Sequence, residues 1–272
     1  MRAFLLAVSL GAALLTLAGV AEARARGGDG RFDARRSTHF LLRQDVAIDQ
    51  RTGPSGTRQF ERDVLRVLEA GYDQLDARLG LRPRRRLEVS IYDPARFDAH
   101  YARLAPFRIA GFYGGSIRVR GDVRVTPALV RTLHHELVHA AFDAVAPGLV
   151  LPGWLNEGLA EWFSARTAGL VPIGGQDFAA LAQIGARGQL LPIARLSAPS
   201  FASLDAGTAP LAYLQSRALV DHLARQHGDQ ALRDLVRRLL RTGDVDGSLA
   251  RAVGVDSAGL EAAFRDELGL AR

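Results

Sequence analysis

The sequence has no cysteine and no lysine among its 272 residues. Without cysteine, the chain forms neither a disulfide framework nor a lipid-modified N-terminal cysteine. No repeat of fixed period is present, which argues against a solenoid or a fibre. Arginine is spread over many segments and lysine is absent, a pattern that a coding bias explains as well as a basic binding surface does. The one dense basic run, at 82–86, precedes an expected strand and is interpreted as a solvated turn, so no nucleic-acid partner is predicted.

Charge and hydrophobicity are typical of a globular protein. Hydrophobic residues make up 48% and charged residues 24% of the sequence, enough for a packed core in one sizeable domain or in two small lobes that share a cleft. The formal net charge of +6 and the sequence pI of about 10.5 predict a weak attraction to anionic components of a cell envelope.

The first 23 residues have the features of a secretory signal peptide. Arg2 supplies the positive end, residues 4–20 are an almost unbroken apolar run, and Ala21 and Ala23 are the small residues expected before a cleavage site. The alternative is an uncleaved membrane anchor, for which the run is slightly short of the roughly 20 residues required. We therefore expect a chain that is periplasmic or secreted after cleavage near Ala23, with no transmembrane segment in its mature part.

The region after the signal peptide begins with glycine and arginine, so residues 24–36 are interpreted as a flexible linker. Beyond it, apolar residues either alternate at strand spacing or recur at helical spacing. The expected elements are strands at 39–42 and 87–92, a helix at 59–79, and a hairpin within 112–125 that turns at Gly121–Asp122. This order predicts an α+β fold that starts with a small sheet.

The remainder of the chain carries helix signals. Thr126 and Pro127 form a strong helix start, a hydroxyl N-cap followed by a proline at the first helical position, and Pro147–Gly148 ends that helix. The next helix is expected at 154–167, followed by helices at 210–226, 232–240 and 259–268. The C-terminal part is therefore predicted to be mostly helical.

The helix opened by Thr126 contains the pattern H-E-x-x-H, formed by His135, Glu136 and His139. A spacing of four places the two imidazoles one turn apart on one helix face, where both reach a single cation. Glu136 lies about 100° around the helix from His135, which directs it to a bound water rather than to the ion. The alternative is an ordinary helix with two surface histidines. A catalytic zinc additionally needs a third protein ligand and an open fourth position.

The expected helix at 154–167 carries the sequence N-E-G-L-A-E. H-E-x-x-H followed by this element resembles the gluzincin metallopeptidases, which include thermolysin-like enzymes and one-zinc aminopeptidases. In those families the glutamate of N-E is the third zinc ligand, which corresponds to Glu157. Glu161 occupies the place of an acidic residue that accepts the free ring N–H of a ligating histidine, and Asn156 is expected to support the site with it. The alternative for Glu161 is a surface acid.

Gly158 and His134 are interpreted from how their helices pack. Gly158 weakens its helix by about 1 kcal/mol relative to alanine, and we expect it where that helix closely approaches the motif helix. His134 points away from the ligand pair and is interpreted as a surface histidine rather than as a second ligand.

The segment from 209 to 228 resembles the C-terminal part of peptidase MA-like domains. Gluzincins commonly use a tyrosine or histidine from this region to donate a hydrogen bond to the reacting oxygen. The resemblance therefore implies Tyr213 as the donor, with His222 as a second choice. The alternative for Tyr213 is a core aromatic on an amphipathic helix.

Together these features predict a zincin-like α+β fold. The lobe at 37–169 would carry the metal helices, and a helical lobe at 170–272 would close over them. The resemblance implies one Zn²⁺ and hydrolysis of peptide bonds in peptide or protein substrates, with Glu136 as general base. Since the aminopeptidase pattern G-x-M-E-N is absent, an endopeptidase of the cell envelope is favoured. Two alternatives stay open: a non-catalytic, zinc-stabilised scaffold or binding protein of the envelope, and a hydrolase of a non-peptide amide.

Overall fold

The structure is a computed structural model that describes residues 32–270. The expected signal peptide and most of the expected linker lie outside the described residues. The last five linker residues are not a linker, because Phe32–Arg36 form strand β1. Their backbone pairs antiparallel with β2 over its whole length, from Phe32 opposite Asp45 to Arg36 opposite Leu41. The predicted linker end at 36 is therefore wrong, because β1 already begins at Phe32.

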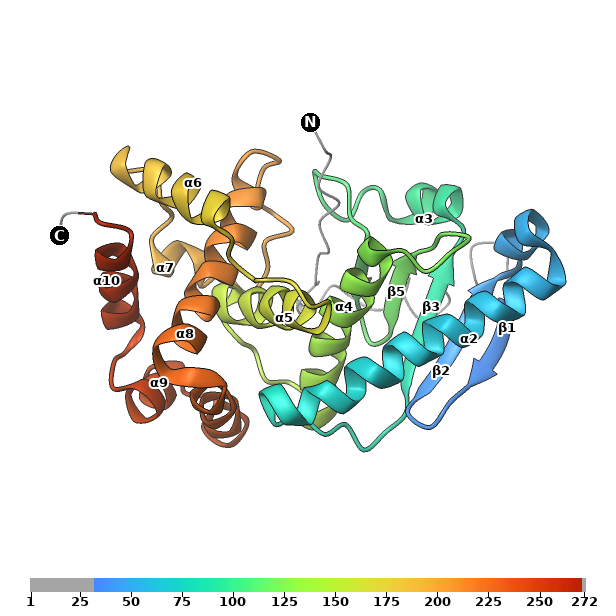
Figure 1. The fold of residues 1–272 in the computed structure, drawn as a ribbon, viewed down its shortest axis with the longest axis horizontal. Coiled ribbons are helices and arrows are strands. Elements are labelled where there is room, and N and C mark those ends of the chain that lie inside the picture. The colour runs from blue at the N-terminus through green and yellow to red at the C-terminus, as the bar shows by residue number, and fades with distance from the viewer. Residues whose placement is uncertain (1–31, 271–272) are drawn as a thin grey trace.

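A five-stranded mixed sheet forms one half of the molecule (Figure 1). Its order is β1-β2-β3-β5-β4, with β2, β3 and β5 parallel to one another and the two outer strands antiparallel to their neighbours. The strands after β1 are β2 (Phe40–Asp45), β3 (Leu87–Tyr92), β4 (Gly111–Tyr113) and β5 (Ile117–Arg120). The short strand β4 is therefore an edge strand.

Helices cover both faces of this sheet. Helix α2 (Val46–Leu79) connects β2 to β3 and begins before the predicted residue 59. On its side of the sheet, Leu87, Val89 and Ile91 are buried at alternating positions, as the sequence predicted for β3. Helix α3 (Pro94–Tyr101) packs on the opposite face, and its first turn is capped by the Asp93 side chain.

The β4–β5 hairpin turns at a different place from the one predicted. The turn consists of Gly114, Gly115 and Ser116, with the Gly114 N–H donating to the Ser116 carbonyl at 3.1 Å. Gly115 has a φ of +80°, which glycine adopts without strain. Gly121, the predicted turn residue, instead continues along β3 by donating to the Tyr92 carbonyl at 2.8 Å. The hairpin therefore turns at Gly115, which adopts a left-handed backbone conformation, and not at Gly121, which is hydrogen-bonded to the end of β3.

The two helices that carry the sequence motifs are found close to the predicted positions. Helix α4 (Pro127–Val145) begins after Thr126, whose Oγ1 accepts a hydrogen bond from Leu129 N at 3.2 Å. Helix α5 is Gly153–Thr167 and ends before Gly169, whose φ is +71°. The centres of both helices are buried, so α4 and α5 form the middle of the molecule.

The C-terminal part is helical, as expected, but its division differs. It consists of α6 (Gly175–Ala186), α7 (Ile193–Leu196), α8 (Thr208–Thr242), α9 (Val245–Val253) and α10 (Ser257–Glu267). The helices predicted at 210–226 and 232–240 correspond to the two parts of α8, which are separated at Gly228, where φ is 81° and ψ is 161° and the backbone is not helical. Helices α6, α7 and α9 were not predicted individually.

Helix α5 packs mainly against α8, and Gly158 lies at a close contact between the two helices. A Cβ at this position would lie 2.5 Å from the Ser216 carbonyl oxygen and 2.7 Å from Val220 Cγ2. Gly158 thus makes room for α8 and not for the motif helix, which corrects the sequence prediction.

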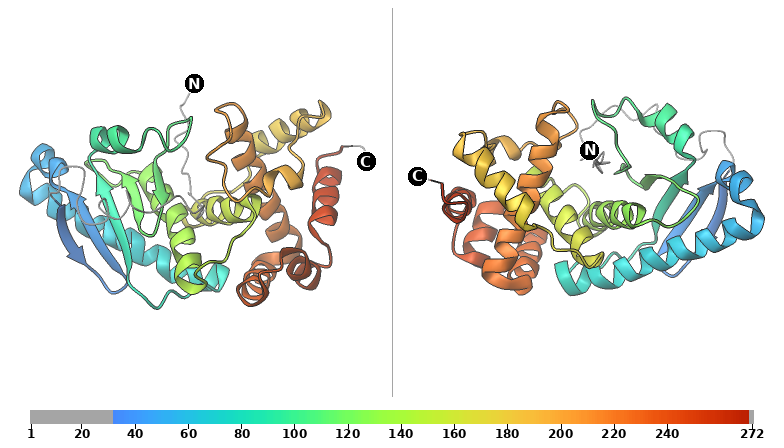
Figure 2. Two further views of the ribbon diagram at one scale, coloured as in Figure 1. Left: turned by 180° about the vertical axis from the view of Figure 1, so that it is seen from behind. Right: turned by 45° about the horizontal axis from the view of Figure 1, so that its top comes forward.

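Figures 1 and 2 show α4 and α5 between the sheet on one side and helices α6 to α10 on the other. One hydrophobic core continues through both parts, with Trp154 and Trp162 fully buried on α5. The proposed lobe boundary at 169/170 coincides with the end of α5 and stays a prediction. Within residues 32–270, no helix combines the length and the apolar character that crossing a bilayer requires.

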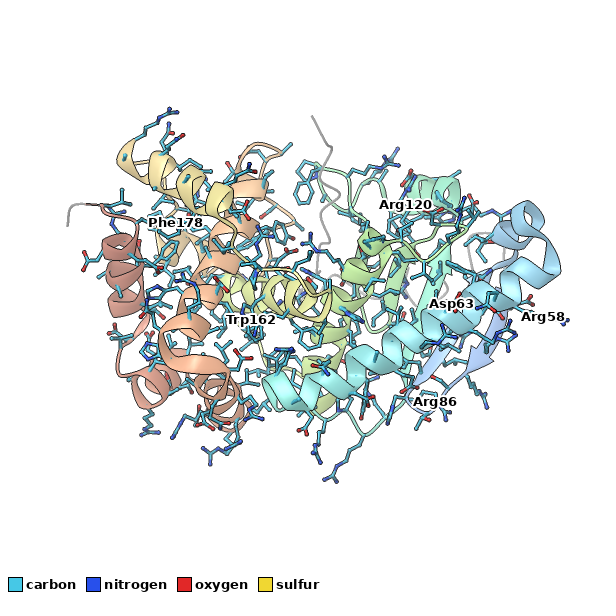
Figure 3. The ribbon with its side chains drawn as sticks, in the orientation of Figure 1. Arg58, Asp63, Arg86, Arg120, Trp162 and Phe178 are labelled. Carbon is cyan, nitrogen blue, oxygen red and sulfur yellow. The ribbon has the colours of Figure 1, made fainter. Side chains whose placement is uncertain are left out.

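The basic run at 82–86 lies on the surface. Figure 3 shows Arg86 on the outside of the sheet half, away from Trp162 in the centre. Arg82 pairs with Asp76, and Arg85 Nη2 lies 2.7 Å from Asp143 Oδ2. Because acidic partners neutralise part of this run, it agrees with the interpretation as a solvated turn.

Candidate metal centre

The motif helix α4 presents His135 and His139 one turn apart on a buried face. Their ring centroids lie 4.9 Å apart, and the two residues are only 1% and 5% exposed. The alternative of two surface histidines is therefore wrong. Leu133, Leu137 and Val138 occupy the other directions of the helix and are fully buried in the core, which holds the histidine face in place.

Helix α5 brings Glu157 to this histidine pair. Glu157 Oε2 lies 3.2 Å from His135 Nε2 and 3.7 Å from His139 Nε2. One ligand atom from each of the three residues can be chosen so that all lie within 4.8 Å of one another. A tetrahedral zinc site with bonds of about 2.0–2.1 Å separates its ligand atoms by roughly 3.3–3.4 Å. The donor types and these separations fit zinc, so the structure assembles the predicted ligand set.

The Nδ1 atom of each histidine faces a different side chain of α5. His139 Nδ1 donates to Asn156 Oδ1 at 3.0 Å, and His135 Nδ1 lies 3.2 Å from Glu161 Oε1. A partner on Nδ1 sets the tautomer and the ring orientation, and leaves Nε2 as the ligand atom. Asn156 and Glu161 therefore stand where the sequence prediction requires supporting residues, and the surface-acid alternative for Glu161 does not hold.

Two arginines that sequence reasoning missed hold the far side of Glu161. Arg131 Nη2 donates to Glu161 Oε2 at 3.3 Å, and Arg217 Nη1 lies 3.7 Å from the same oxygen. Arg217 also donates to Asp177 Oδ2 at 3.1 Å, which connects α8 with α6. The available signal was helical spacing, because Arg131 is one turn before His135.

Electrostatics show that the centre is arranged for positive charge. Burial opposes the charged form of His135, yet the carboxylates of Glu157 and Glu161 raise its pKa to about 10. Burial also opposes ionisation of Glu157, but His139 and His135 lower its pKa to about 2. In the protein alone, a proton on His135 offsets part of the charge of these buried carboxylates. A divalent cation between the same atoms would supply that charge, so metal binding would release protons.

Glu136 lies beside this centre, in contact range of the edge strand. A Cβ placed on Gly111 would come 3.4 Å from Glu136 Cγ and 2.8 Å from Thr132 Cγ2, so the bare glycine lets β4 approach α4. Glu136 is fully buried, and this burial, together with the nearby charges of Glu157 and Glu161, raises its pKa well above the usual range although His135 opposes the shift. A carboxyl group in this state readily carries a proton.

Tyr213 of α8 faces the same cluster from the C-terminal half. Its hydroxyl is buried and has no hydrogen-bond partner among residues 32–270. Burial, reinforced by the carboxylates of Glu157 and Glu136, raises its pKa well above the usual range. The ring also packs edge-on against Phe201 at 5.4 Å, so Tyr213 is a core aromatic whose hydroxyl remains available. His222, the second choice, is bound instead through Nδ1 to Glu267 of α10.

His134 is not a surface histidine, contrary to the prediction. It is 4% exposed, with Nε2 2.9 Å from the Val67 carbonyl oxygen and Nδ1 2.8 Å from Thr167 Oγ1. Helix α2 covers this side of α4, and only a glycine at position 71 leaves space for the ring, since a Cβ there would lie 2.7 Å from His134 Cδ2. His134 therefore ties α4 to α2 and α5.

Residues 124–269, which include both metal-bearing helices, match the model of the peptidase MA superfamily. A crystal structure of a mutant M1 zinc metallopeptidase from Deinococcus radiodurans is similar at a TM-score of 0.47 and 17% sequence identity. The match covers 87% of this chain and 52% of that one, so this chain spans about half the length of that metallopeptidase. The search of curated proteins finds no match.

Proposed function

This chain belongs to the peptidase MA superfamily, and on that premise we propose that it is a zinc-dependent endopeptidase. The observation that carries the proposal is the buried cluster of His135, His139 and Glu157, whose ligand atoms lie within 4.8 Å of one another beside Glu136. A structural zinc site would need neither the buried carboxyl group of Glu136 nor a three-residue ligand set that leaves a fourth position open. The family and the site together support a zinc peptidase.

Zinc held by these three residues would supply Lewis acidity, which lowers the pKa of a bound water toward 7 and polarises a substrate carbonyl. Glu136 takes the proton from the attacking water and returns it to the leaving amine. Glu136 must be ionised to accept the proton, and the positive charge of a bound zinc would oppose the burial that raises its pKa in the protein alone. Asn156 and Glu161 keep the histidine rings oriented during this exchange.

The reacting carbonyl oxygen also needs a hydrogen-bond donor, and Tyr213 is the proposed one. Its hydroxyl is buried, faces the carboxylate cluster and has no competing partner in the described part of the chain. A phenol whose pKa is raised stays protonated at neutral pH, so it can donate. Such a donor contributes most when its position does not change during the reaction.

The edge strand β4 supports peptide as the substrate class. It is the last strand of the sheet, and its first residue, Gly111, lies against Glu136. An extended peptide can add to such an edge through main-chain hydrogen bonds, which would carry its backbone past the base. Binding along a strand does not require a free peptide terminus, and this favours internal cleavage.

We place the enzyme outside the cytoplasm as part of the same proposal. The apolar run at 4–20, with Arg2 before it and small residues after it, supports export through a secretory signal peptide. The lack of cysteine is compatible with that location, since no thiol is present to be oxidised.

Two substitutions and a matched control test the proposal. Glu136→Gln should retain zinc, measured by metal analysis, while cleavage of a mixed peptide library, followed by mass spectrometry, disappears. Glu157→Ala should instead lose most of its zinc. Glu88→Gln removes an exposed glutamate on β3 and should change neither property.

Undiminished turnover by Glu136→Gln would rule out its role as base. Full zinc occupancy in Glu157→Ala would remove that residue from the ligand set. Wild-type protein that carries zinc but cleaves no peptide would favour a scaffold, or an amide hydrolase if a non-peptide amide is cleaved instead. Mapped cleavage sites distinguish internal cleavage from removal of terminal residues.

A further inference from the structure

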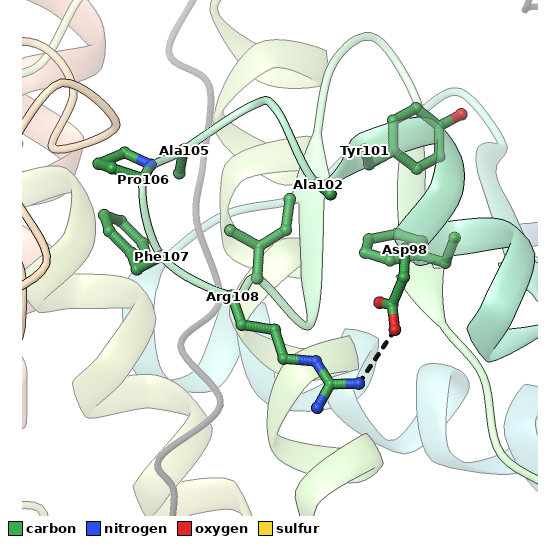
Figure 4. A pocket seen from close by; sticks show the side chains of 9 residues that line it. Asp98, Tyr101, Ala102, Ala105, Pro106, Phe107 and Arg108 are labelled. Atoms are coloured by element: carbon green, nitrogen blue, oxygen red, sulfur yellow. Dashed lines mark hydrogen bonds and ion pairs between the residues drawn. The ribbon is translucent and has the colours of Figure 1, made fainter.

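A pocket of about 400 Å³ lies between α3 and the segment that leads from α3 into β4 (Figure 4). We propose that this pocket is a specificity subsite that takes a large apolar side chain of the substrate, two to four residues from the cleaved bond. The inference rests on the proposed peptidase function and adds a substrate preference to it. No residue of the pocket belongs to the metal centre.

The position of the pocket relative to the base is the first argument. Ile109 lines the pocket, and Gly111, two residues later, begins β4 and lies against Glu136. Two residues of extended chain span about 7 Å. A peptide paired with the outer edge of β4 would therefore place a side chain at the pocket within a few residues of the reacting bond.

The views of the fold agree with this position. In Figures 1 and 2, the segment between α3 and β4 stands opposite the loop between α7 and α8, on the same side of α4 and α5. This segment and the loop between α7 and α8 thus lie on one side of the helices that carry His135 and Glu157. Figure 4 shows Pro106 and Phe107 on the part of the segment that is farthest from α3.

The lining determines which side chains would bind. Its largest apolar contributors are Phe97, Tyr101, Phe107 and Ile109, from both α3 and the following segment. The Tyr101 ring packs on Phe112 of β4 at 4.8 Å, which connects the pocket wall to the edge strand. The Tyr101 hydroxyl donates to Tyr92 at 3.0 Å, so its hydrogen-bonding capacity is used within the sheet. An aromatic or branched aliphatic side chain fits this lining.

Charged groups at the pocket are already paired. Asp98 Oδ1 accepts from Arg120 Nε at 2.9 Å, and Asp98 Oδ2 accepts from Arg108 Nη2 at 3.0 Å. The carboxylate therefore leaves no strong attraction for a basic substrate residue, and Arg108 is not free to select an acidic one. The volume of about 400 Å³ leaves room for a large side chain.

Filling the pocket provides the test. Ala102 is an exposed residue at its wall, and Ala102→Phe would occupy the space with little disturbance of the core. Phe107→Ala changes the wall in the opposite direction and serves if the first variant does not fold. The matched control is Ala250→Phe, at an alanine on helix α9 that is also exposed.

The measurement compares kcat/KM for two peptides that differ by phenylalanine or alanine at the most selective position found by library cleavage. Burying a side chain of this size is worth about a 10- to 100-fold preference. The wild type and Ala250→Phe should prefer the phenylalanine peptide by that factor. Ala102→Phe or Phe107→Ala should lose most of this preference. Equal cleavage of both peptides by the wild type, or an unchanged preference in folded pocket variants, would overturn the inference.

The two proposals fail separately. If the wild type cleaves peptides but shows no apolar preference within four residues of the cut, the subsite is wrong and the peptidase stands. If it cleaves nothing, the peptidase is wrong, and fluorescence anisotropy with labelled phenylalanine and alanine peptides on the zinc-loaded protein decides the subsite. Tighter binding of the phenylalanine peptide that is lost in Ala102→Phe supports the pocket, and equal binding refutes it.

Discussion

Replacing Glu161 by glutamine tests how the protein prepares its histidine ligand. Glu161 Oε1 lies 3.2 Å from His135 Nδ1, and Oε2 lies 3.3 Å from Arg131 Nη2. Glutamine has nearly the same shape and keeps one oxygen for the His135 N–H. It removes the charge, however, and turns an amide NH₂ toward the arginines that the carboxylate had bound.

The expected magnitude follows from the bond that is weakened. A hydrogen bond to a charged group contributes about 1.5–3 kcal/mol and a neutral one about 0.5–1.5 kcal/mol, so the change costs roughly 1–1.5 kcal/mol. Supporting residues of this kind typically change metal affinity by about 10- to 100-fold. We therefore expect the Kd for zinc of Glu161→Gln to rise about tenfold, which corresponds to about 1.4 kcal/mol.

The assay is a zinc titration in competition with a chromophoric chelator at constant pH. Glu69→Gln is the matched control. Glu69 Oε2 also lies close to a histidine Nδ1, that of His39, at 2.6 Å, but neither residue belongs to α4 or α5. The control should bind zinc as the wild type does. A wild-type Kd in folded Glu161→Gln would refute the reasoning that Glu161 prepares His135.

Three further predictions follow from the same contacts. Tyr213→Phe should lower kcat by about 10²- to 10³-fold without changing the unfolding temperature, because the hydroxyl has no partner among residues 32–270; a kcat near the wild-type value would exclude it as the donor. Gly158→Ala should lower the free energy of unfolding in urea by about 1–3 kcal/mol, whereas Gly175→Ala, at the exposed first residue of α6 where a Cβ meets open space, should not lower it. The pKa of Asp98 is lowered because its two arginine partners outweigh its burial. Its contribution to stability should therefore be complete above the usual pKa of about 3.9 and be lost as the pH falls below it, and urea unfolding from pH 3 to 6 should show a weaker pH dependence in Asp98→Asn.

Local signals in the sequence were sufficient for the elements that carry the chemistry. The start of α4 depends on Thr126 and Pro127, which act within one turn. The relation between His135 and His139 depends only on the helical repeat. These features involve neighbouring residues, so the motif and its helix could be predicted without knowledge of the rest of the fold.

Features that depend on contacts across the chain could not be read in the same way. Sequence placed the hairpin turn at Gly121, but pairing with β3 occupies that residue and moves the turn to Gly115. His134 has the same spacing pattern as a surface residue, yet α2 covers it. The pattern records which residues share a face of one helix and does not record which other element packs there.

The metal centre shows both kinds of determination. The sequence by itself determined that His135 and His139 share a helix face with Glu136 next to them, because a helix places residues four apart on one face whatever surrounds it. The resemblance to gluzincins identified Glu157, and only the tertiary structure set its carboxylate within 3.7 Å of both Nε2 atoms. Only the tertiary structure revealed that Arg131 donates a hydrogen bond to Glu161 and that Arg217 forms an ion pair with it. Their convergence depends on the packing of α4, α5 and α8, which no local repeat encodes.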